Sequence, residues 1–117
     1  MKLLYAHGNE RDDTLLQYAN NQNAHSVTVV DNGKDAYKSF LEENPDMMIL
    51  DIDVPDIEVP NLIKTIRQIN KSDIPILLLL QPEQMHMLEP AMKKGANNFL
   101  VTPFSESAFN RTLGMHL

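Results

Sequence analysis

The sequence contains no cysteine, so disulfide bridges, zinc–thiolate sites and thiol catalysis are excluded. Positive charge is also scarce: ten Lys and Arg stand against sixteen Asp and Glu, and the formal net charge is −6 at pH 7. A surface of this sign repels nucleic-acid phosphates and acidic membranes, and we expect neither as a partner. The longest apolar run covers residues 76–80, far short of the roughly 20 residues that cross a membrane. Together these absences predict a soluble, cytoplasmic protein.

The composition is otherwise that of an ordinary globular domain, with 43% hydrophobic and 22% charged residues. A length of 117 residues suits one folded unit, because domains cluster near roughly 100–150 residues. The sequence also lacks linker-like and low-complexity stretches. We therefore predict a single domain over residues 1–117.

Five apolar runs mark candidate strands, and each gap between them is long enough for one helix. The runs begin 20 to 29 residues apart and cover Leu3–Ala6, Val27–Val30, Met47–Leu50, Ile76–Leu80 and Phe99–Val101. The runs 47–50 and 76–80 show no polar alternation, which is typical of strands buried on both faces of a parallel sheet. This pattern predicts an α/β fold: a five-stranded parallel sheet, order 2-1-3-4-5, with helices on both faces.

The segments between the runs carry helical periodicity together with start and stop signals. Pro60 and Pro82 suit the first turn of the third and fourth helices, because the missing N–H is not needed there. Gly95 is expected to end the fourth helix, and Ser105 to cap the fifth. Pro90 lies inside the fourth helical segment, where it removes a backbone hydrogen bond, so we expect that helix to be kinked, shortened or mobile.

In open α/β sheets, ligands bind at the carboxyl ends of the strands. The residues expected at that edge are His7, Gly8, Asp51, Asp53, Leu80, Gln81 and Thr102. Asp51 follows four apolar residues, and a carboxylate is costly to hold in a core, so the exposed strand end is its expected location.

The sequence around Asp51 resembles the phosphoacceptor strand and loop of response-regulator receiver domains from two-component signalling. Further matches occur in order at Asp31-Asn32-Gly33, Ile74-Pro75-Ile76, Lys94-Gly95-Ala96-Asn97-Asn98-Phe99 and Thr102-Pro103-Phe104. The resemblance covers essentially the whole chain. It implies a flavodoxin-like fold, Asp51 as the phosphoacceptor, Phe99 as the switch aromatic and a cis peptide at Thr102–Pro103.

The other positions that the resemblance implies are divergent. Receivers hold Mg²⁺ with an acidic pair after the first strand, where this sequence has His7 and Gly8. They place Thr or Ser after the fourth strand, where Leu80 stands, and a Lys before the proline of the fifth-strand loop, where Thr102 stands. Leu80 donates no hydrogen bond, and Thr102 brings no positive charge. We therefore predict a degenerate receiver-like module with weak or no Mg²⁺-dependent phosphorylation of Asp51.

Any Mg²⁺ site is expected to be weak, since this ion is usually bound through one or two carboxylates together with phosphate and water. The weak candidate ligands are Asp51 and Asp53. Displaced ligands could come from Asn9, Glu10, Asp12 or Asp56. His7 is interpreted as a rim histidine rather than a metal ligand.

A non-enzymatic module of this kind would act through protein partners: a histidine kinase, an effector domain or a second copy. The resemblance points to the fourth helix, fifth strand and fifth helix as the contact face. Met87 falls off the apolar stripe of the fourth helix, so Met85, Met87 and Phe99 are predicted to form part of that face. Flexible thioethers suit adaptable contact surfaces.

Two alternatives remain open. One is a conventional aspartyl-phosphate switch at Asp51 that uses substitute metal ligands. The other is a small flavodoxin-like cofactor-binding protein, which is poorly supported because the turn 7–11 lacks the glycine spacing and Ser or Thr donors that cradle phosphate.

Overall fold

Strands and helices alternate along the chain, as the spacing of the apolar runs predicts. The computed structural model describes residues 1–21 and 25–116, so Leu117, the last residue of the predicted domain, lies outside it. The strands are β1 (Lys2–Ala6), β2 (Ser26–Val30), β3 (Met47–Asp51), β4 (Ile76–Leu80) and β5 (Asn98–Val101). The α-helices are α1 (Asp13–Asn21), α2 (Gly33–Glu43), α3 (Val59–Lys64), α4 (Leu88–Lys94) and α5 (Glu106–His116).

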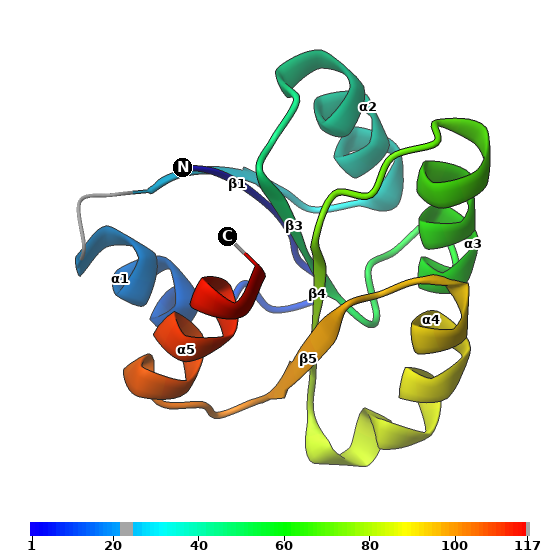
Figure 1. The fold of residues 1–117 in the computed structure, drawn as a ribbon. Helices are drawn as coiled ribbons and strands as arrows, with labels where there is room; N and C mark the ends of the chain where they lie inside the picture. The colour runs from blue at the N-terminus through cyan, green and yellow to red at the C-terminus, as the bar shows by residue number, and fades with distance from the viewer. Residues whose placement is uncertain (22–24, 117) are drawn as a thin grey trace.

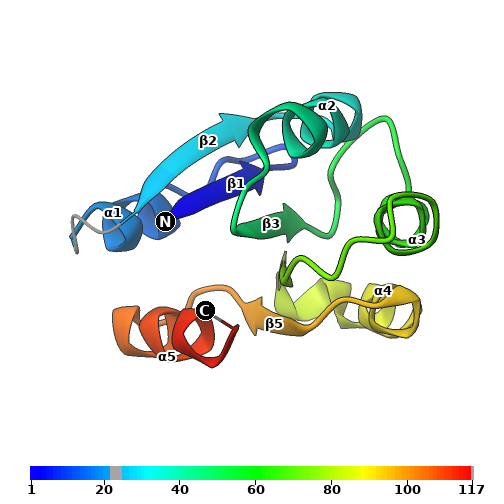
Figure 2. The same cartoon turned by 45° about the horizontal axis from the view of Figure 1, so that its top comes forward.

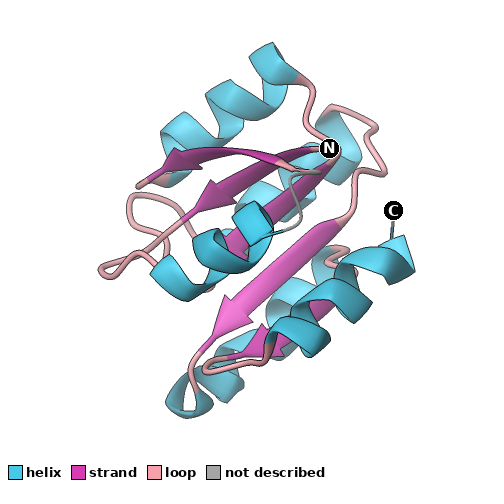
Figure 3. Ribbon diagram, turned by 90° about the vertical axis from the view of Figure 1, so that its left-hand side faces the viewer, coloured by secondary structure: helices cyan, strands magenta, loops and turns pink. Residues whose placement is uncertain are grey.

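All strand pairs are parallel, and the sheet order β2-β1-β3-β4-β5 confirms the predicted topology. Helices α1 and α5 lie on one side of the strands, and α2, α3 and α4 on the other (Figure 1). Figure 2 shows β2 and β5 at opposite edges, and Figure 3 shows the sheet between its two helical layers. The carboxyl ends of the strands therefore meet at one edge of the sheet.

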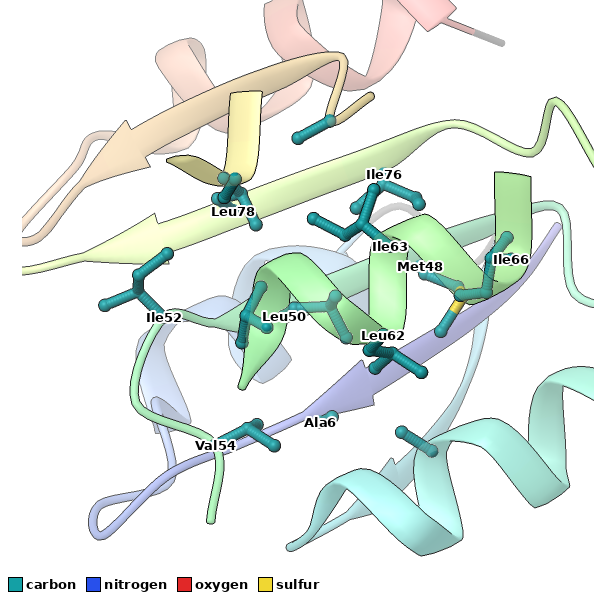
Figure 4. Packing of buried hydrophobic residues seen from close by; sticks show 14 of the residues in the cluster. Ala6, Met48, Leu50, Ile52, Val54, Leu62, Ile63, Ile66, Ile76 and Leu78 are labelled. Carbon is teal, nitrogen blue, oxygen red and sulfur yellow. The ribbon is translucent and has the colours of Figure 1, made fainter. Parts of the chain in front are cut away.

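The sheet divides the core into two apolar layers, because successive side chains of a strand point to opposite faces. Leu4, Met48, Leu50 and Leu78 face one layer, where side chains from α3 pack against them (Figure 4). The opposite layer combines alternate residues of the same strands with α1 and α5. It also contains Tyr5, a fully buried residue with a polar hydroxyl group.

The segment containing Pro90 is a short 3-10 helix, residues Pro82–Met87, followed by a seven-residue α4. Pro90 is the third residue of α4, so its missing N–H falls in the first turn, where an α-helix has no partner for it. The predicted shortening is confirmed. Gly95 ends α4 at φ 122°, and the Ser105 hydroxyl accepts a hydrogen bond from the Ala108 N–H at 3.0 Å, as predicted. Pro82, however, opens the 3-10 helix and not an α-helix.

The third helix continues as a π-helical turn over Thr65–Ile69, which the periodicity does not predict. This turn carries Arg67, whose guanidinium donates to the carbonyl oxygens of Ser72 (3.0 Å), Ile74 (2.7 Å) and Gly95 (2.8 and 3.1 Å). It also donates to Asn97 Oδ1 at 2.8 Å. One side chain thus joins the end of the third helix to the loops that precede β4 and β5.

Thr102–Pro103 is a cis peptide, as the resemblance implies. Within residues 1–21 and 25–116, no helix has the length and apolar character needed to cross a bilayer.

Candidate functional site

A cleft of about 520 Å³ opens at the carboxyl edge of the sheet, where the sequence places the site. The loops after β1, β3, β4 and β5 all contribute to its walls. The lining residues are Asn9, Glu10, Arg11, Asp12, Asp13, Thr14, Asp51, Asp53, Leu79, Leu80, Gln81, Gln84 and Thr102. Asp51, Asp53, Leu80 and Thr102 are thus brought together as predicted.

Asp51 is the last residue of β3 and is half-buried at the floor of the cleft. Its Oδ2 accepts a hydrogen bond from the Gly8 N–H at 2.8 Å. The Tyr5 hydroxyl lies 3.2 Å from Oδ1 and 3.3 Å from Oδ2, so it is shared between the two carboxylate oxygens. Both contacts come from the neighbouring strand β1 or the turn that follows it.

The electrostatics of the cleft oppose ionisation of Asp51. Burial raises the pKa of Asp51 to about 6, and the negative charges of Asp53 and Asp12 act in the same direction. The hydrogen bonds from the Gly8 N–H and the Tyr5 hydroxyl lower this pKa, but they do not cancel the effect of burial. The surroundings of Asp51 therefore stabilise its ionised carboxylate poorly.

Tyr5 is the site residue that sequence reasoning misses, because it stands within an apolar run and reads as core. Its oxygen also accepts the Asp12 N–H at 3.0 Å. Burial, followed by the charge of Asp51, raises the pKa of the Tyr5 phenol, so the hydroxyl keeps its proton as a donor. The available signal is a hydroxyl-bearing side chain one position before the carboxyl end of a central strand.

His7 and Gly8 replace the acidic pair that the resemblance implies. His7 Nδ1 and the Gly8 carbonyl oxygen are 2.8 Å apart, with the carbonyl as acceptor, and His7 makes no hydrogen bond to Asp51. A Cβ at position 8 would overlap the Asp53 carboxylate, which lies directly over Gly8. A second acidic side chain at position 8 would therefore require Asp53 to move.

The predicted weak magnesium ligands, Asp51 and Asp53, both line the cleft. Across residues 1–21 and 25–116, no group of three or more His, Asp or Glu side chains is arranged to hold a metal. Asp53 is exposed and accepts a hydrogen bond from Gln84 Nε2 at 3.3 Å. Glu10 lines the cleft without joining such a group.

Two of the suggested displaced ligands cap helices instead. Asp12 Oδ1 accepts the Leu15 N–H at 3.1 Å, at the start of α1. Asp56 Oδ1 accepts the Gly33 N–H at 2.7 Å, and Asp56 does not line the cleft. The suggestion that Asp56 supplies a metal ligand is therefore wrong: orphan N–H groups at the first turn of α2 take up its carboxylate.

The walls of the cleft are strongly negative. Five carboxyl side chains line it, from Glu10, Asp12, Asp13, Asp51 and Asp53. Arg11 also lines the cleft, and its guanidinium forms an ion pair with the Asp13 carboxylate at 2.7 Å. Positive charge from the protein thus stays on the rim, away from the carboxyl group on the floor.

The remaining predicted site residues, Leu80, Thr102 and Phe99, carry no charged hydrogen-bond donor. Leu80 is buried, and its carbonyl oxygen accepts the Thr102 N–H at 2.9 Å. Thr102 is half-buried. Phe99 lies on β5 and is half-buried against the core layer that contains Leu78.

The predicted partner face is only partly exposed. Met85 is 43% exposed, in agreement with the prediction. Met87 is half-buried and packs against the core, so its position off the apolar stripe does not leave it fully exposed.

The sequence of this chain is similar to those of known proteins. The family model described as the response regulator receiver domain matches residues 12–113. The alkaline phosphatase synthesis transcriptional regulatory protein PhoP of Bacillus subtilis is 29% identical over 109 residues, which are 93% of this chain and 45% of PhoP. This chain spans less than half the length of PhoP and of other curated relatives.

Solved structures resemble the whole fold. A putative response regulator from Chloroflexus aurantiacus J-10-fl has a TM-score of 0.81 and 25% identity, over 97% of this chain and 94% of that one. The receiver domain of sensor histidine kinase PA1611 from Pseudomonas aeruginosa PAO1 has a TM-score of 0.83 and 23% identity, over 98% and 95%. That receiver holds a magnesium ion in its active site cleft, and its likeness to this chain concerns the fold.

Proposed function

The chain belongs to the family of response regulator receiver domains, and from this premise we propose that it signals through protein partners, with weak or no magnesium-dependent phosphorylation of Asp51. In this proposal residues 1–117 form one receiver module that works in the cytoplasm. The module catalyses no reaction of its own and does not contact nucleic acid.

The environment of Asp51 is the observation that carries this proposal. Phosphoryl transfer requires that negative charge on the transferred group be neutralised, usually by a metal ion and a cationic side chain. Here the cleft is lined by five carboxyl side chains, and burial already raises the pKa of Asp51 to about 6. The phosphoryl group of an acyl phosphate carries about 1.5 to 2 negative charges, so after loss of the carboxylate's own charge the cleft would gain about one further negative charge.

The neighbouring positions give little compensation. Leu80 offers only an apolar side chain, and a hydrogen bond from the Thr102 hydroxyl is about half as strong as one from a charged donor. Asp51 and Asp53 belong to no group of three or more metal-ligating side chains in the part of the chain that the structure describes. Both the capture of a phosphoryl group and the reading of its presence are therefore poorly supported.

The proposed partners are a histidine kinase, an effector domain or a second copy of the chain. The proposed contact face comprises the 3-10 helix Pro82–Met87 together with α4, β5 and α5. Exposed Met85 and half-buried Phe99 supply its apolar contacts. Sedimentation at micromolar concentration tests self-association, and a strict monomer there would remove the second copy from this list.

The test of the phosphorylation statement is a titration with Mg²⁺ and then with beryllofluoride, followed by amide chemical shifts. We expect no saturable change around Asp51 in the millimolar range. Asp51→Asn serves as the control for nonspecific ion effects, because it removes the candidate acceptor. Saturable binding to the unmodified protein, with shifts that reach Phe99, would contradict the proposal.

A conventional switch is the second candidate, and one observation favours it. Asp53 is exposed, lines the same cleft as Asp51 and lies above Gly8, so its carboxylate is available for a small rotation. In that case the titration above would saturate, and Asp53→Asn would abolish the saturation.

A further inference from the structure

The contacts of Tyr5 differ from those of an ordinary core tyrosine. Its ring is fully buried in the layer beneath α1 and α5, and its hydroxyl lies against Asp51, which lines the cleft. The oxygen lies 3.2 and 3.3 Å from the two carboxylate oxygens of Asp51 and accepts the Asp12 N–H at 3.0 Å. The hydroxyl is therefore fixed from two sides, by β3 and by the start of α1.

The position of this hydroxyl matters because it is nearly equidistant from both carboxylate oxygens. A group so placed lies in the plane that bisects the carboxylate, where any ligand bound by both oxygens would also lie. The Gly8 N–H takes a further lone pair of Oδ2 at 2.8 Å. Together, Tyr5 and Gly8 engage both oxygens of Asp51 with neutral donors from β1 and its following turn.

The dependence is mutual. A buried hydroxyl that loses its acceptor pays the desolvation penalty of an unpaired donor. Tyr5 is 0% exposed, so water does not contact its hydroxyl while Asp51 is in place. The Asp12 N–H polarises the phenol oxygen and strengthens the O–H as a donor toward Asp51.

We infer that Tyr5 is a positioning residue that locks the Asp51 carboxylate in one arrangement and withholds it from ligands and from chemical attack. The inference rests on the proposed function, since it supplies the reason why Asp51 stays inactive in a fold that matches receivers. The lock consists of one phenol, and it acts before any metal or phosphoryl donor is present.

The first test measures the availability of the carboxylate without a ligand. The protein and Tyr5→Phe are labelled at neutral pH with a water-soluble carbodiimide and an amine, and the rate at each carboxyl group is followed by mass spectrometry. Tyr5→Phe keeps the ring and removes the hydroxyl, and we expect Asp51 to be labelled about fivefold faster in this variant than in the parent protein. Asp53, which is exposed in the same cleft, is the internal standard and should label at an unchanged rate.

The matched control is Tyr37→Phe. This variant also removes one phenol hydrogen bond, from the Tyr37 hydroxyl to Asn70 Oδ1 at 2.9 Å, but on α2 away from the cleft. It should leave the labelling of Asp51 within about twofold of the parent protein. Equal labelling of Asp51 in the parent and in Tyr5→Phe would overturn the inference.

The second test is a double-mutant cycle in urea unfolding. In the parent protein, Tyr5→Phe should lower the folding constant about fivefold. In the Asp51→Ala background the carboxylate that accepts from the Tyr5 hydroxyl is already missing, so Tyr5→Phe should change the folding constant by less than about twofold. An equal effect in the two backgrounds would refute the lock. Neither test uses a metal, so the proposed function fails separately, through saturable Mg²⁺ and beryllofluoride binding by the unmodified protein.

Discussion

Replacing Asp51 with asparagine should stabilise the protein at neutral pH and lose that effect in acid. Asparagine has nearly the same shape and keeps an oxygen that accepts the Gly8 N–H, now 2.8 Å from the carboxylate. It removes the charge that burial, Asp53 and Asp12 make unfavourable. The expected gain therefore depends on whether Asp51 of the parent protein is ionised.

The magnitude follows from the pKa of Asp51, which is about 6 in the folded protein against the usual 3.8. The difference of roughly two pKa units corresponds to about 3 kcal/mol, at about 1.4 kcal/mol for each unit. Because the folded state binds more protons between these values, stability falls as the pH rises from about 4 to about 6. Asp51 thus costs little below that window and the full amount above it.

Equilibrium unfolding in urea, followed by far-UV circular dichroism at about pH 4.5 and about pH 7.5, measures this difference. Asp51→Asn should exceed the parent by about 2 to 3 kcal/mol at the higher pH and by less than about 1 kcal/mol at the lower one. Glu83→Gln is the control, since it removes the same charge from an exposed position. A gain that is equal at both pH values would refute the reasoning.

Two further predictions concern the scaffold and use the same unfolding assay. Arg67→Met should cost about 3 kcal/mol, because several part-buried carbonyl groups lose a charged donor. Arg11→Ala removes an exposed ion pair and should cost less than about 0.5 kcal/mol. A loss below about 1 kcal/mol for Arg67→Met would show that water replaces the guanidinium. Gly33→Ala should cost about 1 to 3 kcal/mol, since the added Cβ would overlap the side chain of Ile57. Gly114→Ala meets nothing within 4 Å and should instead stabilise α5 by about 0.5 to 1 kcal/mol; equal effects of the two alanines would contradict the packing argument.

The order of elements was predictable because it depends on local signals. Continuous apolar runs mark β3 and β4, and both strands are completely enclosed up to Leu50 and Leu80. The shortened α4 followed from the geometry of Pro90. Parallel pairing then follows, since each strand is separated from the next by a single helical connection.

The π-helical turn and the role of Arg67 could not be predicted in the same way. The acceptors of its guanidinium lie 5 to 30 residues away along the chain, on two different loops. Nothing in the helical spacing of residues 62–69 distinguishes a continued α-helix from a π-helical turn. Tertiary contacts decide this part of the structure.

The candidate site shows the same division. Asp51 and Thr102 could be placed because the carboxyl ends of parallel strands meet at one edge. The capping role of Asp12 had a readable signal, since an aspartate directly before a helix is a common N-cap. The role of Tyr5 had none strong enough, because a buried tyrosine in an apolar strand usually indicates packing.

Burial raises the pKa of Asp51, and its contacts with Gly8 and Tyr5 do not offset that effect, so the same shortage of compensation would meet a phosphoryl group. A cation beside a carboxylate lowers its pKa, and the same cation would stabilise a phosphoryl group on it. Thr102 stands where the resemblance implies a lysine, so that position supplies no positive charge to Asp51. Asp51 instead loses its negative charge by binding a proton from water. The pKa therefore serves as a direct gauge of the potential that an incoming phosphoryl group would meet. A pKa measured near or below 4 by carboxyl carbon chemical shifts would mean that the cleft compensates negative charge, and the case against phosphorylation of Asp51 would then lose its physical basis.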